Sequence, residues 1–359
     1  MIERFLILDH EPPSPNSEPL IFCDGAGGDA FRPEQDLDLS HWRPNRTPRQ
    51  YRAGTSTEIC FHFLDAPLPG PWTLAVNNHL DIDGLLSVYA LVHSKHAQEN
   101  RTAIIQAAEM GDFWGWGEAS AQRLFQGLTQ LMNAGRSAGQ PLQAIYDEAF
   151  RRVPALLDGS DPDVDSLERS LEPLRQGVQS IAVGAISRRP ISERLTHYLI
   201  PQSVVGDRWD QINYVPKFNE IISPRALLWP QARAKWDEQR LCLVSALSRD
   251  GWRHDLWFPG YLWADTENRW VIPGLNYRDG MESYDVAMPR FGQAIEHLNQ
   301  LEQRCACWAT GAAESKFSAT IQGQFPLAAR TLDAAGVPVA SSLEPDLVAA
   351  TLGKVFPDS

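Results

Sequence analysis

The segment from Trp72 to Ser87 constrains the fold more than any other part of this chain of 359 residues. An apolar run, Leu74-Ala75-Val76, is followed at alternate positions by His79, Asp81 and Asp83. Charged groups at the end of a buried strand need partners or a cation, because burial without either is costly. The pattern therefore predicts one end of a divalent-metal site at the tip of a core strand.

The spacing of these groups supports a shared ligand face. Alternate side chains of an extended segment point the same way, so His79, Asp81 and Asp83 lie on one side of the chain. Gly84 then allows the chain to turn into a helix. Carboxylates suit Mg²⁺ and Mn²⁺, and one imidazole shifts the preference toward Mn²⁺.

Three groups within five residues cannot complete the coordination of such an ion, so other segments must contribute. We expect a parallel strand over 102–109, which would end beside the first one. Asp112 stands just past it as the fourth ligand, with Glu109 in reserve. Asp24 follows a strand over 20–23 and is a spare ligand.

The expected elements follow from hydrophobic periodicity and from turn residues. Strands are predicted over 4–9, 20–23, 57–64, 72–78, 102–109, 212–215, 226–229, 241–247, 252–258 and 305–310. Helices are predicted over 84–97, 118–134, 141–157, 164–187, 285–303 and 343–353. The succession of strand, helix and strand from 72 to 110 predicts a parallel crossover unit.

These elements predict an α/β fold. It would hold a parallel or mixed sheet flanked by helices, a helical middle segment and a smaller α+β C-terminal part. We expect one domain over residues 1–205, with the helices as its extension, and a second over 206–359.

Charge and composition limit the partners. The formal net charge of −13 disfavours long nucleic acids as partners, because phosphate binding requires a basic face. No apolar run reaches the roughly 18 residues needed for a membrane span. Five cysteines without a Cys-x-x-Cys pair are typical of a reducing cytoplasm. The expected partner is a small-molecule substrate, and the sequence leaves the oligomeric state open.

The pattern His-x-Asp-x-Asp-Gly-x-x-Ser, from His79 to Ser87, resembles the first motif of the DHH phosphoesterase superfamily. In that superfamily the histidine and both aspartates bind a pair of Mn²⁺ ions, and the following strand supplies another aspartate. Asp112 stands at the matching place. The resemblance implies a doubly wound parallel sheet and hydrolysis of a phosphoester or phosphoanhydride, with Mn²⁺ or Mg²⁺ as cofactor.

A longer set of segments is similar to a family of uncharacterised bacterial proteins, and it implies no activity. These segments are 38–42, 46–48, 55–58 and 77–84.

Other readings of the same residues stay open. Asp81 and Asp83 could cap the helix that begins near residue 84, with His79 as a hydrogen-bonded core histidine. The Asp-His-His triplet of the superfamily does not occur in this chain, which motivates a non-catalytic binding or accessory protein as a second hypothesis. A metal-dependent hydrolase of a non-phosphate bond is the third.

Outside the motif, His41 and His254 are the histidines with the strongest functional signal, since each stands beside arginine and tryptophan. We expect Arg253 or Arg43 to contact the substrate and His254 to act as a general acid. Asn78 and Ser87 are expected to support the ligands without binding the metal themselves.

Overall fold

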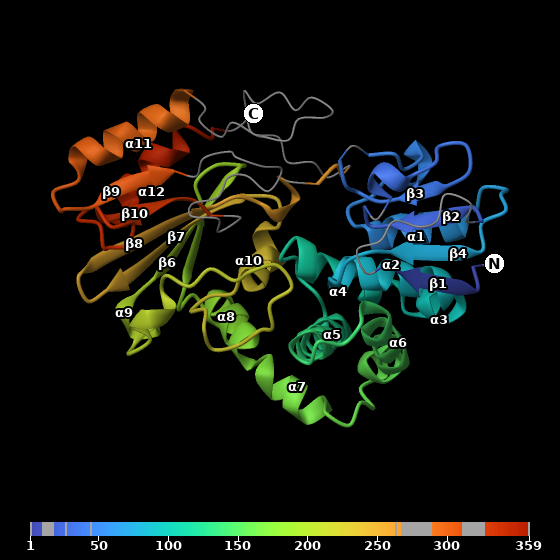
Figure 1. Ribbon diagram of the computed structural model, residues 1–359. Coiled ribbons are helices and arrows are strands. Elements are labelled where there is room, and N and C mark those ends of the chain that lie inside the picture. The colour runs from blue at the N-terminus through green and yellow to red at the C-terminus, as the bar shows by residue number, and fades with distance from the viewer. Residues whose placement is uncertain are drawn as a thin grey trace. The chain divides into compact units, whose positions relative to one another are not determined.

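The computed structural model describes residues 2–8, 18–25, 27–43, 45–262, 264–266, 289–310 and 327–357. The chain divides into two compact units (Figure 1). The first runs to Leu171 and also includes Phe218–Ile221 and a short segment that begins at Ala264. The second starts at Glu172 and holds the rest. This division differs from the boundary at 205–206 expected from the sequence.

The first unit is built on a four-stranded sheet of β1 (Arg4–Ile7), β2 (Leu20–Cys23), β3 (Leu37–Leu39) and β4 (Leu74–Asn77). Its strand order is β1-β4-β2-β3, and every neighbouring pair is parallel. β2 is buried along its whole length, which suits the interior of a parallel sheet covered on both faces.

Helices cover this sheet, and those after residue 118 belong to the predicted helical middle of the chain (Figure 1). They are α1 (Ser56–Asp65), α2 (Ile82–Val92), α3 (Ser94–Glu99), α4 (Arg101–Asp112), α5 (Ala119–Ser137), α6 (Leu142–Asp158) and α7 (Val164–Ser170). α2 contacts β1, β2 and β4, and α1 contacts β3. The α/β fold class is therefore confirmed.

The strand predicted over 57–64 is wrong, because this segment forms α1. Thr55 caps the helix, its side chain accepting a hydrogen bond from Glu58 N at 3.1 Å. The Glu58 carboxylate in turn accepts one from Gly54 N at 3.1 Å. This is close to a capping box, and it decides the conformation of an apolar run whose composition also suits a strand.

The strand predicted over 102–109 is also wrong, because the segment lies in α4. Ile104, Ala107 and Ala108 are fully buried, and this spacing of three and four residues is the period of a helix. The predicted crossover unit from 72 to 110 is therefore absent from the sheet. β4 pairs instead with β1 and β2, both of which precede it in the chain.

The second unit has a mixed sheet with the order β5-β6-β7-β8-β10-β9. Its strands are β5 (Ser187–Pro190), β6 (Leu195–Ile200), β7 (Leu241–Ser248), β8 (Gly251–Trp257), β9 (Cys307–Thr310) and β10 (Leu327–Leu332). Its α-helices are α8 (Glu172–Ala182), α9 (Gln202–Val205), α10 (Pro230–Asp237), α11 (Pro289–Leu301) and α12 (Pro345–Gly353). Only β6 and β7 pair in parallel.

Several predicted elements in the second half of the chain are wrong. The helix over 164–187 is two helices, α7 and α8, and the chain turns at Gly184 before β5. Residues 212–215 and 226–229 form no strand. The strands that the sequence analysis did not predict are β3, β5, β6 and β10. β6 is buried at five of its six positions, so it lacks the alternation that marks a strand. The end of the predicted helix 285–303 that precedes Pro289 lies outside the described residues.

Candidate metal centre

Three neighbouring parallel strands end at one edge of the first sheet, and a side chain that can bind a metal follows each of them. Asp24 directly follows β2, and His41 and His79 lie two residues past β3 and β4. The strand order β4-β2-β3 places β2 in the middle. Asp24 therefore lies between the two histidines, because the carboxyl ends of parallel strands share one edge of the sheet.

Asp24 divides its two carboxylate oxygens between these histidines. Oδ1 lies 3.4 Å from His41 Nε2, and Oδ2 lies 2.9 Å from His79 Nε2. Oδ1 also accepts hydrogen bonds from Trp42 Nε1 and Ser56 Oγ, each at 2.8 Å. The backbone of Asp24 has a φ of 51°, in the left-handed region that residues other than glycine seldom adopt. A carboxylate held in this way can bridge two cations.

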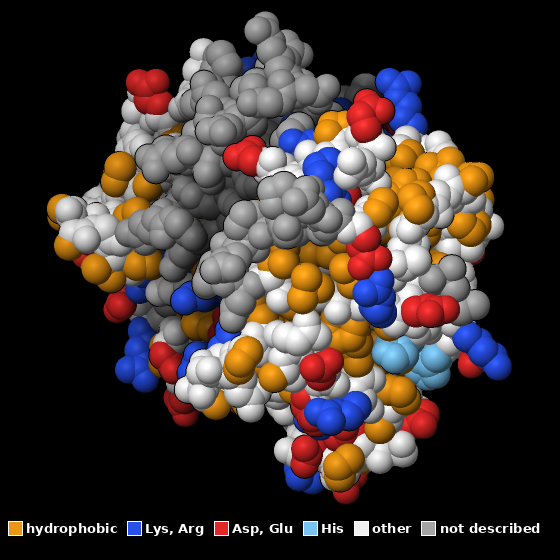
Figure 2. Space-filling model, turned by 45° about the vertical axis from the view of Figure 1, so that its right-hand side comes forward, with side chains coloured by type: hydrophobic (Ala, Val, Ile, Leu, Met, Phe, Trp, Pro, Cys, Tyr) orange, Lys and Arg blue, Asp and Glu red, His pale blue; other side chains and the backbone are white. Residues whose placement is uncertain are grey.

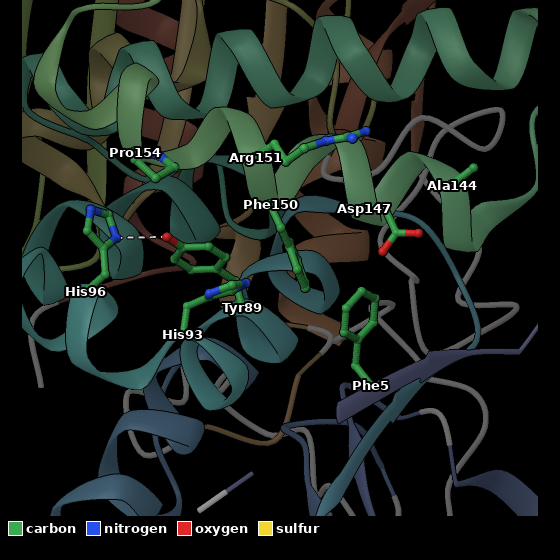
Figure 3. Close-up of a pocket in the computed structure, with 9 residues that line it drawn as sticks. All are labelled: Phe5, Tyr89, His93, His96, Ala144, Asp147, Phe150, Arg151 and Pro154. Atoms are coloured by element: carbon green, nitrogen blue, oxygen red, sulfur yellow. Dashed lines mark hydrogen bonds between the residues drawn. The ribbon is translucent and has the colours of Figure 1, made fainter. Parts of the chain in front are cut away.

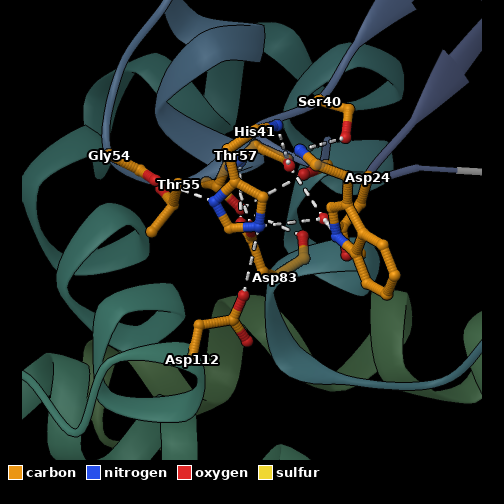
Figure 4. A network of polar contacts seen from close by, with 12 residues as sticks. Asp24, Ser40, His41, Gly54, Thr55, Thr57, Asp83 and Asp112 are labelled. Atoms are coloured by element: carbon orange, nitrogen blue, oxygen red, sulfur yellow. Dashed lines mark hydrogen bonds and ion pairs between the residues drawn. The ribbon is translucent and has the colours of Figure 1, made fainter. Parts of the chain in front are cut away.

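The inner group consists of Asp24, His41 and Asp83, with Asp112 beside them (Figure 4). His41 Nε2 lies 3.6 Å from both Asp83 Oδ2 and Asp112 Oδ2, in addition to its contact with Asp24. His41 Nδ1 lies 2.8 Å from Gly54 O, and a carbonyl oxygen can only accept, so Nδ1 carries a proton. Nε2 is thus directed at three carboxylates, and the opposite nitrogen orients the ring, as is common for metal-binding histidines.

The outer group consists of Asp24, His79 and Asp81. His79 Nε2 lies 3.1 Å from Asp81 Oδ2, and His79 Nδ1 lies 3.0 Å from Asn78 Oδ1. The side chains of His79 and Asp81 are 29% and 20% exposed, whereas those of Asp24, His41 and Asp83 are fully buried. Solvent therefore reaches the outer group and is excluded from the inner one.

Two of the carboxylates also serve as helix caps. Asp81 is the N-cap of α2 and accepts a hydrogen bond from Gly84 N at 2.8 Å. Asp83 accepts hydrogen bonds from Ser56 N and Thr57 N at 2.7 and 2.8 Å, at the start of α1. The capping alternative thus holds for Asp81, whereas Asp83 caps a helix other than the one expected. Asp81 directs its other oxygen, Oδ2, at His79.

Asp112 reaches the inner group from the last residue of helix α4, and not from the end of a strand. Asn219 hydrogen-bonds with the Asp112 carboxylate, and its Oδ1 accepts from Ile82 N at 3.0 Å. Asn219 adopts a left-handed backbone conformation, with a φ of 50°. A Cβ at Gly111 would lie 2.6 Å from Asn219 Oδ1, so only glycine allows this approach. A short segment distant in sequence therefore joins the start of α2 to the end of α4.

The loop that carries His79 is anchored by neighbouring helices. Tyr146 on α6 donates a hydrogen bond from its hydroxyl to His79 O at 2.9 Å. Arg136 on α5 donates to Leu80 O. These contacts fix the backbone of the outer group without occupying its ligand atoms.

The buried carboxylates of the centre carry negative charge that no lysine or arginine among the described residues balances through an ion pair. In the described part of the chain no Lys or Arg forms an ion pair with Asp24, Asp83 or Asp112. Burial would raise the pKa of Asp24, but hydrogen bonds with His41 and His79 hold it far below its usual value.

Two further carboxyl groups of the centre and both histidines have raised pKa values. Burial, with the negative charge of Asp24, raises the pKa of Asp83 to about 7. Burial and the charge of Asp83 raise the pKa of Asp112 well above its usual value. Burial would lower the pKa values of His41 and His79, but the carboxylates around them raise both. Without a cation, part of this negative charge is therefore neutralised by protons.

The donor set fits hard divalent cations. Four carboxylates and two imidazoles converge, and each imidazole has its Nδ1 next to an oxygen that can accept its proton. Oxygen ligands suit Mg²⁺ and Mn²⁺, and imidazole nitrogen favours Mn²⁺ of the two. A cation would also balance carboxylates that no arginine or lysine neutralises.

The three residues expected to take part in catalysis belong to different units. Arg43 Nη2 lies 3.8 Å from Asp265 Oδ1, and its side chain is 7% exposed, so it is placed to anchor the loop after His41. Arg253 and His254 lie on β8 in the second unit. His254 is buried, with Nδ1 2.8 Å from Ser245 Oγ and Nε2 3.1 Å from Leu343 O, an arrangement that supports a structural role.

The sequence did not predict the central positions of Asp24 and His41 in the site. Asp24 was only a spare ligand, and His41 was a functional histidine without a stated role. The signal that could have found them is the rule that ligands gather at the carboxyl ends of parallel strands. Applying it to His41 required recognition of β3, a strand of three residues. Ser87 lies near the centre, with its Oγ 3.4 Å from Thr57 Oγ1.

A separate cavity of about 780 Å³ opens in the first unit (Figure 3). It is lined by Phe5, Tyr89, His93, His96, Ala144, Asp147, Phe150, Arg151 and Pro154. Tyr89 and Phe150 are buried and pack against each other with ring centroids 5.3 Å apart. The Tyr89 hydroxyl lies 2.8 Å from His96 Nδ1, so these two polar groups of the lining are paired with each other, and the metal centre remains the stronger candidate.

Two further observations, on the surface charge and on the helices, concern nucleic-acid and membrane partners. On the face in Figure 2, Lys and Arg side chains alternate with Asp and Glu and form no single basic area. Within the described residues, no helix has both the length and the apolar character needed to cross a bilayer.

Comparison with known proteins gives one match. The model of a family of unknown function, DUF6687, matches residues 13–276, which include every residue of the inner and outer groups. The chain belongs to this family. No curated protein and no solved structure matches the chain. Family membership therefore leaves the activity to be argued from the site.

Proposed function

We propose that this DUF6687 protein is a metal-dependent hydrolase of the phosphoesterase type that acts on a small phosphorylated molecule. The bridging position of Asp24, shared by the inner and outer groups, carries the proposal. The inner group, with Asp112, would hold one Mn²⁺ or Mg²⁺ ion, and the outer group a second. The resemblance of the His79–Ser87 pattern to the DHH superfamily agrees with this assignment.

The difference in exposure gives the two groups different tasks. His79 and Asp81 are the exposed members, so a substrate can approach only the outer group from solvent. The fully buried inner group is suited to hold an ion permanently. Trp42 donates to Asp24, and its ring lies 5.7 Å from that of His79, so an indole borders the approach.

The residues of the chain prepare the site before substrate arrives. Gly54 O keeps the Nδ1 proton of His41 in place, which leaves Nε2 toward the carboxylates. The contacts of Tyr146 and Arg136 keep the His79 loop from moving away. When bound, the ions would supply a positive charge for the phosphoryl oxygens and lower the pKa of an attacking water.

Two alternatives remain, and the first has an observation in its favour. Because Asp81 and Asp83 cap helices, the same residues could persist for stability in a non-catalytic binding protein. The second alternative is a metal-dependent hydrolase of an amide or ester bond, since the same cations also polarise carbonyl groups.

Metal analysis with a substrate panel separates these functions. We expect the purified protein to hold up to two Mn²⁺, with Asp24→Asn losing both and Asp81→Asn losing only the outer ion. Asp147→Asn, an exposed carboxylate in the same unit, is the matched control and should keep the full content. Turnover of phosphoesters, including nucleotides, but not of amides or carboxylic esters supports the proposal. Metal-free protein of unchanged stability supports the binding protein.

The proposal places the protein in the cytoplasm. All five cysteines are free thiols, which suits a reducing compartment.

A further inference from the structure

We propose that Asn77 binds the substrate at this centre, with its side-chain amide donating a hydrogen bond to a phosphoryl oxygen. The inference rests on the proposed function, because it requires an anion at the outer group. Asn77 is the last residue of β4, directly before the loop of Asn78 and His79, and it is fully buried.

The orientation of the Asn77 amide is set by the backbone that follows it. Its Oδ1 accepts hydrogen bonds from Asn78 N at 2.5 Å and from His79 N at 3.2 Å. An amide nitrogen could not accept from these two donors, so oxygen and nitrogen cannot be exchanged. Nδ2 therefore lies on the side away from the loop backbone.

Nδ2 has no hydrogen-bond partner among the described residues, although it is buried. A buried donor without an acceptor is unfavourable, because it has lost its hydrogen bonds to water without replacement. A ligand oxygen would supply the acceptor.

The surroundings of Gly84 show where this donor points. A Cβ built at Gly84 would lie 2.3 Å from Asn77 Nδ2, 3.0 Å from Asp81 Oδ1 and 3.1 Å from Asp24 Oδ2. The amide nitrogen thus packs against the backbone of Gly84 beside two carboxylate oxygens of the outer group, an approach that only glycine at residue 84 allows. A bound cation would balance the charge of these carboxylates. A phosphoryl oxygen beside that cation would accept a hydrogen bond from Asn77 Nδ2.

The test is titration of inorganic phosphate into Mn²⁺-saturated protein, followed by calorimetry. Asn77→Asp keeps an acceptor for both backbone N–H groups and removes the donor, while Asn77→Ser removes the amide without adding charge. A hydrogen bond to a charged group predicts phosphate affinity about 10–100-fold weaker in both variants. Asn133→Asp, on an exposed position of α5, controls for added charge and should stay within about threefold of wild type.

Metal content and thermal unfolding are measured on the same samples. If the Asn77 variants hold Mn²⁺ as wild type does and bind phosphate equally well, the assignment of Asn77 is wrong. If they lose Mn²⁺, Asn77 acts by positioning the loop, and the inference also fails. Wild-type protein that holds Mn²⁺ but no phosphate contradicts this inference alone. Wild-type protein that takes up no Mn²⁺ overturns the proposed function as well.

Discussion

The two units each hold a pair of histidines, and the pairs differ in what surrounds them. In the first unit, the Nε2 atoms of His41 and His79 face carboxylates. In the second, His197 and His254 flank the hydroxyl of Ser245, at 2.9 and 2.8 Å. The residue type is the same in both pairs, so the neighbouring groups decide what each pair can do.

The second network is complete within the protein. Leu343 O must accept from His254 Nε2, so His254 Nδ1 accepts from the Ser245 hydroxyl. Ser245 Oγ accepts in turn from His197 Nε2, and His197 Nδ1 accepts from Arg189. Burial, with further lowering by Arg189 for His197, brings the pKa values of both histidines to about 4. The two neutral imidazoles and the Ser245 hydroxyl find their partners within the protein, whereas the carboxylates of the first unit carry charge that a cation would balance.

The largest expected effect is that added Mn²⁺ stabilises the first unit and leaves the second unchanged. At a free Mn²⁺ concentration of about 100 times Kd, binding stabilises the folded state by about 2.7 kcal/mol. Amide exchange in β2, β4 and the start of α2 should slow by about 100-fold, while exchange in β7 and β8 stays unchanged. Hydrogen exchange with mass spectrometry measures both in one sample, and Asp24→Asn should abolish the effect. Equal slowing of amide exchange in the two units would contradict a metal site confined to the first unit.

Asn219→Ala should weaken Mn²⁺ binding by about 10–100-fold, the usual consequence of removing a residue that orients a ligand. The substitution leaves Ile82 N without its acceptor and Asp112 without its hydrogen bond. Calorimetric titration of Mn²⁺ measures the affinity. An unchanged affinity would show that Asp112 needs no support from this segment.

His254→Ala should destabilise the protein without altering its metal content. It removes the acceptor of the Ser245 hydroxyl proton and the donor to Leu343 O, at a cost of about 1–3 kcal/mol for each buried group. Urea unfolding gives the loss of stability, and metal analysis gives the content. A loss of Mn²⁺ with unchanged stability would instead show that His254 contributes to metal binding.

The smallest expected effect is a pH dependence of metal-free protein. The folded state raises the pKa of Asp112, so it binds the proton more tightly than the unfolded chain does. The stability contributed by this proton is lost as pH rises. Asparagine mimics the protonated form, so the stability of Asp112→Asn relative to wild type should increase as the pH rises above the usual pKa of a carboxyl group. Urea unfolding at several pH values measures it, and a constant difference would show that Asp112 is not held among negative charges.

The sequence predicted the fold class and several elements but not the path of the chain through the sheet. The strand over 20–23 has the predicted bounds, and a helix does follow the motif of β4. α1 and α4 were predicted as strands because their apolar residues include β-branched and aromatic types that suit either element. The cap at Thr55 and the buried spacing in α4 are the features that decide for helix.

The candidate site, like the fold, was predicted only in part from the sequence. Asp112 lies near His41, as expected of a residue near the centre, but a helix end delivers it where a strand was predicted. Asn219 carried no detectable signal, because 107 positions separate it from Asp112 and its role depends on a left-handed backbone that single-residue patterns do not show. The bridging role of Asp24 depends on β2 lying between β3 and β4.

The sequence alone determined that His79, Asp81 and Asp83 follow a buried strand, since an apolar run is a local property of the chain. The single ligand face predicted from their alternation is wrong, because Asp83 lies in α2 and joins the inner group, whereas His79 and Asp81 belong to the outer one. Only the tertiary structure decided which of the other acidic and imidazole groups join them. Strand order in a parallel sheet is set by packing between segments far apart in sequence, and it brings Asp24 and His41 to the same edge.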